Sequence, residues 1–340
     1  MFLKAHCRGP ANDYMLLAAR ADLLLYLFEL VAFPRCEGPL PRRGVPWSGD
    51  EPPVKRLFNR LLPKSWRSNV AVIPVIRLHG TIMAGGGQFR PSLSLASTAG
   101  LIEKAFSLEA PAVAISINSP GGSPVQSRLI YKRIRDLAAE KNRKVLVFVE
   151  DVAASGGYMI AVAGDEIFAD PSSIVGSIGV VSASFGFPEL MKKIGVERRV
   201  HTAGQNKAVL DPFKPEKKED VERLKALQLE VHETFIDLVR ERRGEKLKDD
   251  PDLFTGLFWT GKKGLDLGLV DALGDMRGVL KQRFGEKTQL RLITPPRGFL
   301  GRFGLFGSKK GFSPSDIASA AAGGIVDAAE ERALWARFGL

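Results

Sequence analysis

The sequence predicts an α/β protein in which helices cover a mostly parallel β-sheet. Two stretches of the same design, residues 112–139 and 144–161, carry this prediction. Each reads as an apolar run, a turn of small residues and a helix-compatible stretch, and such a run is typical of a strand buried on both faces. Because parallel strands end at one edge of the sheet, we expect both turns there, where open α/β folds place their sites.

The turn in the stretch 144–161 contains a candidate nucleophile. Five small residues, Ala153 to Gly157, follow the apolar run Val145 to Val149, and Tyr158 then begins an apolar, helix-compatible segment. Ser155 therefore lies at a strand-to-helix turn, with its hydroxyl at the positive N-terminal end of the next helix. The glycines would let another backbone approach closely. The alternative interpretation is a packing turn of small residues without a chemical role.

The stretch 112–139 supplies a second turn suited to acyl transfer. Val113, Ile115 and Ile117 indicate a buried strand, and the turn Asn118–Gly122 precedes a helix expected over Ser127–Ala139. Exposed N–H groups at a Gly-Gly turn can bind the oxyanion that develops when a carbonyl is attacked.

Composition and charge set the broad class of protein. With 340 residues, 45% of them hydrophobic, the chain can bury a full core. The formal net charge of +11 suits anionic surfaces such as membrane headgroups or nucleic acid. We find no nucleic-acid recognition module and expect no nucleic-acid partner. The two cysteines, Cys7 and Cys36, form no disulfide framework.

The first part of the chain differs from the rest, and we predict three regions: an N-terminal extension (1–68), a main domain (69–291) and a C-terminal tail (292–340). Tyr14–Phe33 is apolar but contains Arg20, Asp22 and Glu29, which are costly at the centre of a bilayer. It also lacks the pattern of a cleavable signal peptide. We expect an amphipathic helix that lies on a membrane or packs on a partner, or else a dispensable extension.

A short basic stretch, residues 55–67, ends the extension and either binds anionic lipid or forms a solvated helix face. These features predict a protein that is peripheral to a membrane or cytoplasmic. The tail is rich in Gly and Phe from Pro295 onward and then in Ala, and it would cover a neighbouring subunit or stay flexible.

Periodicity predicts the remaining elements of the main domain. We expect strands at 72–78, 166–170 and 196–202, a glycine-bearing turn and strand within 171–181, and helices at 97–108, 187–194 and 216–243. The apolar stripe of the last helix, from Val221 to Leu238, would face the core or a subunit interface.

Four motifs in order make the chain recognisable. NSPGGSP (118–124), DVAASGGYMIA (151–161), SIVGSIGVV (173–181) and GQNKAVLDPF (204–213) resemble peptidase family S49, also called signal peptide peptidase A or protease IV. The resemblance spans about residues 72–291. It implies a ClpP/crotonase-like fold, with repeated ββα units around a mostly parallel sheet, and a serine endopeptidase that uses a Ser/Lys dyad. One set of motifs is present, as in the single-length form of the family.

A serine hydroxyl needs a base, and none of the four histidines lies in a motif that makes it one. Only His79, after a strand end, remains as a rival. A lysine can act as base when burial or a like charge keeps its amine neutral. The resemblance assigns that role to Lys207, and to Ser177 the role of orienting the lysine amine. Lys207 would otherwise be a surface lysine and Ser177 a turn hydroxyl.

For the oxyanion we expect backbone N–H groups at Gly121 and Gly122, with Gly156 as a further contributor. The glycine loops would flank an edge where an extended peptide adds as a strand, which implies broad specificity. This chemistry requires no metal or cofactor. The resemblance further implies peptide or signal-peptide substrates and a homo-oligomeric ring, in which serine and lysine can come from neighbouring subunits.

Two other interpretations remain open. A crotonase-type acyl-CoA enzyme shares the fold class and the oxyanion turns, although a Ser/Lys pair is superfluous there and no acidic base is evident in the glycine turns. A catalytically silent scaffold that binds peptides or membranes is the third.

Overall fold

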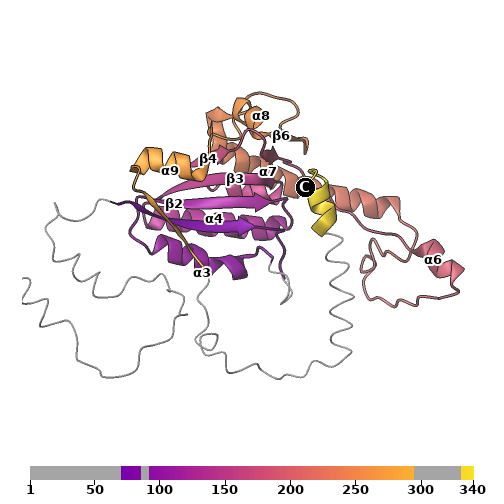
Figure 1. The fold of residues 1–340 in the computed structure, drawn as a ribbon. Coiled ribbons are helices and arrows are strands. Elements are labelled where there is room, and N and C mark those ends of the chain that lie inside the picture. The colour runs from indigo at the N-terminus through magenta and orange to yellow at the C-terminus, as the bar shows by residue number, and fades with distance from the viewer. Residues whose placement is uncertain (1–69, 86–91, 295–330) are drawn as a thin grey trace, which may run out of the picture. The chain divides into compact units, whose positions relative to one another are not determined.

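The computed structural model describes residues 70–85, 92–294 and 331–340, which form a sheet with helices on both faces (Figure 1). The predictions for the extension 1–68 and for most of the tail fall on residues outside these ranges. Within the described ranges, no helix is both long and apolar enough to cross a membrane.

The sheet has eight strands, in the order β6-β5-β3-β2-β1-β8, with β4 and β7 branching from β3. All pairs are parallel except the antiparallel pair β5–β6. The predicted α/β class with a mostly parallel sheet is therefore confirmed. The strands are β1 (Val72–His79), β2 (Ala112–Ser119), β3 (Lys144–Ala154), β4 (Glu166–Ala169), β5 (Ile174–Gly176), β6 (Phe258–Thr260), β7 (Ala272–Leu273) and β8 (Gln289–Leu292).

Strand β3 organises the sheet because it pairs with three other strands, β2, β4 and β5. Its first half pairs with β4, and its last residues, Val152–Ala154, pair with β5. The apolar run Val145–Val149 is buried, as its composition predicts, since β2 flanks it on the other side.

The helices divide over the two faces of the sheet. One large core cluster joins one face to α3 (Leu95–Phe106), α4 (Pro124–Glu140), α5 (Gly156–Ala161) and the end of α7 (Lys218–Arg243). A smaller cluster on the other face packs against α9 (Met276–Phe284), through Leu280. The described part of the chain also contains α6 (Pro188–Lys193), η2 (Gly244–Lys246), α8 (Gly261–Asp266) and helical residues at 331–336.

The strand predicted at Val196–Thr202 is wrong, since these residues form no strand. They belong to residues 181–217, here called the arm, which contains α6 and stands away from the sheet in Figure 1. Alternating side chains become a strand only beside another strand, and the arm offers none to pair with. The turn and strand predicted within 171–181 are present, and the strand is Ile174–Gly176.

The two halves of helix α7 differ in burial. Its C-terminal half is buried through Phe235, Ile236, Leu238, Val239 and Arg243, whereas Leu227 and Leu229 in its first half are exposed. The apolar stripe thus reaches the core only near the end of the helix, and its beginning extends toward the arm.

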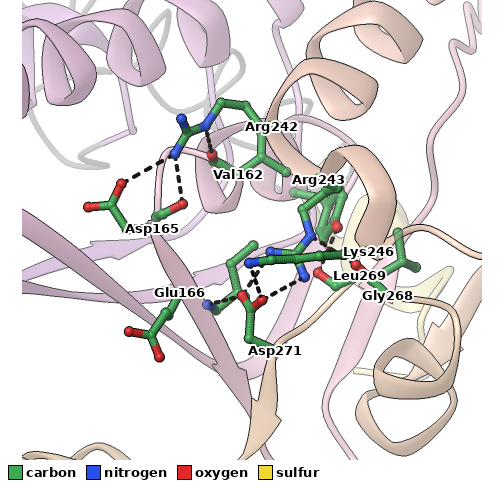
Figure 2. A network of polar contacts seen from close by, with 12 residues as sticks. Val162, Asp165, Glu166, Arg242, Arg243, Lys246, Gly268, Leu269 and Asp271 are labelled. Carbon is green, nitrogen blue, oxygen red and sulfur yellow. Dashed lines mark hydrogen bonds and ion pairs between the residues drawn. The ribbon is translucent and has the colours of Figure 1, made fainter.

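A polar network fastens the end of α7 to the sheet (Figure 2). Arg243 is 3% exposed and donates to both carboxylate oxygens of Asp271, at 2.8 and 3.2 Å, and to the Gly268 carbonyl. Asp271 also accepts from Lys246 and from the Ile167 N–H. Because the pair is buried and its hydrogen bonds are satisfied, it fixes the orientation of the helix that leads to the arm.

Arg242 binds on the neighbouring side of the same helix end. Its guanidinium donates to the carbonyls of Val162 and Gly164 and lies 3.5 Å from Asp165. Figure 2 shows the two arginines directed at different carboxylates, so α7 is held at two points.

We predict that Asp271→Asn lowers the free energy of unfolding by about 3–5 kcal/mol, because it leaves the Arg243 charge buried without its partner. Urea denaturation at neutral pH measures this change. Asp249→Asn, at an exposed carboxylate of the same region, is the control and should stay within about 0.5 kcal/mol of the parent. Equal stability of both variants would contradict the anchoring role.

The same pair has a pH signature. Burial alone would raise the pKa of Asp271, but hydrogen bonds from Arg243, Lys246 and the Ile167 N–H lower this pKa below its usual value of 3.8. The contribution of the Asp271 carboxylate to the free energy of unfolding is therefore complete above its unfolded-state pKa. This contribution is lost as the pH falls through the folded-state pKa. The acid-induced loss of stability below about pH 4 should be shallower in Asp271→Asn than in the parent.

Candidate active site

The Ser155 backbone makes the sharp turn between β3 and α5. Its φ of +51° and ψ of −122° are rare for a residue with a side chain. The turn is held by the Ser155 N–H, which donates to the Gly176 carbonyl at 2.8 Å, and by the start of α5. Residues kept in such conformations cluster at functional sites, and a serine on a strained strand-to-helix turn presents its hydroxyl outward. No G-x-S-x-G pattern surrounds Ser155, and its backbone conformation agrees with the strand-to-helix turn that the small residues predict.

The two glycine turns meet as the parallel strands predict. A Cβ placed on Gly121 would lie 2.9 Å from the Ser155 Cβ and from the Gly156 nitrogen. A Cβ on Gly157 would lie 2.5 Å from the Ser119 carbonyl oxygen. The backbones approach so closely that no side chain fits between them, which explains the run of glycines in both turns.

Two amides beside Ser155 are unused. Among the described residues, no acceptor takes the N–H of Gly122 or of Gly156, whereas Gly121 donates to the Ser119 hydroxyl at 3.2 Å. Gly122 is kept in place by Ile82, which bonds the backbone on both sides of it. Two free donors next to a serine hydroxyl are the arrangement that an oxyanion hole requires.

A cavity of about 210 Å³ opens at this point. Its walls come from both glycine turns, from α7 and from the C-terminal segment (residues 331–340), and include Gly122, Ser155, Gly156, Met159, Phe235 and Leu334. Ser155 is partly exposed, so the cavity gives a substrate access to it.

The predicted bases lie in different places. His79 bonds the Ser116 hydroxyl at 2.8 Å and lies 3.4 Å from Glu150, and it does not line the cavity. Burial lowers the pKa of His79 and the Arg77 charge lowers it further, against the opposing charge of Glu150. His79 is thus engaged away from Ser155.

Lys207 does not line the cavity either. It is exposed, in the turn of the arm between α6 and α7. Ser177 is buried next to Gly176, with a φ of +52°, and its N–H donates to the Leu257 carbonyl at 2.7 Å. Within one chain, Ser155 and Ser177 are therefore close along β5 and the nucleophile turn, and Lys207 is carried separately by the arm.

The C-terminal segment was not expected at this site. Phe338 is buried against Val152 and Ala154 and packs edge-on to Phe258, with ring centroids 5.0 Å apart. Leu334 and Arg337 reach the cavity wall. The apolar pattern of the last residues, ALWARFGL, was the available signal for a packed helix, but nothing in it indicated which surface the helix would cover.

Comparison with known proteins agrees with the geometry. The profile described as "Peptidase family S49" matches residues 138–289, which include Ser155, Ser177 and Lys207. This match supports the placement of the chain in peptidase family S49, a family of serine-type peptidases.

Two protease-named relatives support this assignment. The chloroplastic serine protease SPPA of Arabidopsis thaliana is 34% identical over 212 residues, 60% of this chain and 31% of that protein. A protein of Methanocaldococcus jannaschii that is named as a protease is 35% identical over 170 residues, half of this chain and 54% of that protein.

A third relative carries a conflicting name. A Brucella abortus protein named "Na(+)/H(+) antiporter NhaA" is 67% identical over 287 residues, 84% of this chain but only 39% of that protein. The chain thus spans well under two thirds of this relative. The name describes the whole Brucella protein, whereas the shared part includes the S49 region with its serine turn, so the antiporter name is not transferred to this chain.

We predict that Gly157→Ala destabilises the protein by about 1–3 kcal/mol, because the new methyl group meets the Ser119 carbonyl and forces the two turns apart. Gly100→Ala is the matched control: Gly100 is exposed in α3, a Cβ there meets nothing, and a gain of about 0.5–1 kcal/mol is expected. Urea unfolding of both variants measures the difference, and a Gly157→Ala protein as stable as the parent would show that the turns need not touch.

We also predict that Phe338→Ala releases the C-terminal segment, because the Phe258 ring contact and the Val152–Ala154 contact are lost together. Amide hydrogen exchange at residues 331–340 should become at least about tenfold faster while exchange in β3 stays unchanged. Leu340→Ala, at an exposed side chain, should leave exchange as it is. Equal exchange in parent and Phe338→Ala would contradict the packing.

Proposed function

We propose that this chain is a serine endopeptidase of the signal peptide peptidase A type, in which Ser155 and Lys207 of neighbouring subunits form the catalytic dyad. The observation that carries the proposal is the strained Ser155 turn, which brings a hydroxyl, two free amides and a cavity together. Peptides or membrane-derived signal peptides would be the substrates.

The arm supports a dyad between subunits. Its exposed apolar side chains and those at the start of α7 remain largely open to solvent in a single chain, among them Val181, Phe185, Leu190, Ile194, Leu227 and Leu229. Exposed apolar groups gathered on one projection are typical of an interface, and a second copy is the simplest partner. A ring of such copies would bring the arm of one subunit to the cavity of the next.

The proposed reaction is acyl transfer. The Ser155 Oγ–H proton passes to the neutral Lys207 amine, and Oγ forms a bond to the scissile carbonyl carbon. The Gly122 and Gly156 N–H groups hold the oxyanion. The carbon–nitrogen bond then breaks, the lysine returns the proton to the leaving amine, and a water activated by the same amine hydrolyses the ester.

An exposed lysine carries a proton and has no lone pair to accept another. Docking of the arm into the apolar cavity of a neighbour would remove water and favour the neutral amine. Met159, Phe235 and Leu334 supply such walls. Assembly would therefore create the base, and a monomer would have none at Ser155.

The test uses two inactive parents. Ser155→Ala and Lys207→Ala should each abolish peptide cleavage and labelling by a fluorophosphonate, while Lys214→Ala, at an exposed lysine on the same arm, should not. When the two inactive proteins are co-assembled in equal amounts, about one quarter of the sites regain both residues, and activity should return to that extent.

The outcomes separate the steps of the proposal. A fully active Lys207→Ala protein would exclude the dyad. Inactive parents that never complement each other would place both residues in one subunit. Labelling that persists in Ser155→Ala would show that another residue reacts.

A further inference from the structure

The arm contains an ion pair in which the carboxylate is buried, although the arginine side chain is 40% exposed. The Asp211 side chain is only 5% exposed and pairs with the Arg198 guanidinium. Its Oδ1 also accepts the Phe213 N–H at 3.1 Å, and its Oδ2 is buried without a partner among the described residues. A buried carboxylate of this kind tolerates little displacement of its partners.

An aromatic stack extends the pair. The Arg198 guanidinium lies over the Phe213 ring, 4.7 Å from its centroid, and the Phe187 ring lies 5.7 Å from that of Phe213. The Phe187 N–H donates to the Pro212 carbonyl at 2.6 Å. Three separate parts of the arm, around residues 187, 198 and 211–213, are therefore joined at one point although none belongs to a core cluster of the sheet.

Lys207 lies in a loop whose two ends, at Arg198 and Asp211, are joined by the ion pair. Its loop leaves Arg198 on one side and returns to Asp211 four positions after the lysine. Leu210 has a φ of +57°, and its N–H donates to the Asp220 carboxylate at 3.4 Å, in the first turn of α7. The loop itself contains a single internal backbone bond, from the Lys207 N–H to the Gly204 carbonyl at 3.3 Å.

We propose that Arg198, Asp211 and Phe213 form a positioning unit that sets where the Lys207 amine can reach. The proposal rests on the function proposed above and names residues that act through the lysine without touching the substrate. The unit holds the two ends of the loop together, so the amine is presented at one distance from the arm. A base misplaced by about 1 Å can cost about a hundredfold in rate.

A neighbouring ion pair on the arm differs from the Arg198–Asp211 pair because both of its side chains are exposed. Arg199 and Glu197 form a bond of 2.8 Å with both side chains more than 70% exposed. Such a pair contributes little to structure. It lies on the same arm, next to Arg198, and thus provides a matched control.

The experiment measures how fast a rhodamine-tagged fluorophosphonate reacts with Ser155 in the full-length assembly. In this reaction the Ser155 Oγ–P bond forms, the P–F bond breaks with loss of fluoride, and the proton passes to the base. The saturating rate constant reports on the base, and the half-saturating concentration reports on binding. Assembly is followed in parallel by analytical ultracentrifugation.

We expect Asp211→Asn and Arg198→Gln to lower the saturating rate constant by about tenfold to a hundredfold, with less than about a twofold change in the half-saturating concentration. Phe213→Leu should have a similar effect, and Phe213→Tyr, which keeps the ring, should restore the parent rate. Glu197→Gln should stay within about twofold of the parent.

Each other result overturns the inference or its foundation. Parent-like rates in Asp211→Asn and Arg198→Gln, with Lys207→Ala inactive, would refute the positioning unit and leave the dyad intact. A slow variant that has dissociated into monomers would make the unit part of the assembly interface instead. A fully active Lys207→Ala protein would remove the proposed dyad itself, whatever the other variants do.

Discussion

The close approach of two backbones at the carboxyl edge of the sheet is the constraint on which the site depends. Gly121 and Gly157 lie where any side chain would meet the opposite turn, and β2 and β3 deliver those turns in register. Given that contact, Ser155 has to turn through a left-handed conformation to enter α5. The strain is sustained because the residues on both sides of Ser155, Ala154 and Gly156, are buried and its N–H is bonded to the Gly176 carbonyl.

Ser155 and Lys207 lie in different kinds of structure, the first in the packed core and the second on the arm. The strands and the helix α5 that hold Ser155 belong to the core, whereas no residue of the segment that carries Lys207 is part of a core cluster. The link between the two parts is α7, whose last turn is fixed by Arg243 and Asp271 and whose first half is exposed (Figure 2). The arm thus extends from a firmly anchored helix.

Local sequence patterns predicted much of the fold and the position of the candidate nucleophile. The apolar runs of β2 and β3 and the small-residue turns after them indicated both the parallel sheet and the place where Ser155 lies. The order of four motifs indicated peptidase family S49, which the profile match supports. Residues 196–202 misled because their alternation resembles a strand, and pairing depends on neighbours that periodicity does not reveal. The placement of residues 331–340 depends on a surface assembled from Val152, Ile174 and Phe258, which lie in three separate strands. The pairing of Arg198 with Asp211 could not be predicted either, because it joins two segments of the arm that periodicity does not relate.

In the proposed reaction, folding of one chain would prepare the nucleophile, and association of subunits would prepare the base. Folding of one chain already fixes the backbone at Ser155, Gly122 and Gly156, so in the proposed reaction little reorganisation would remain there when a carbonyl is attacked. The base is different, because an exposed amine gains a lone pair only when water is removed around it. In the proposed ring, association would supply that desolvation, and the anchored α7 together with the arm would give it direction. Catalytic power would then depend on subunit contacts far from the scissile bond.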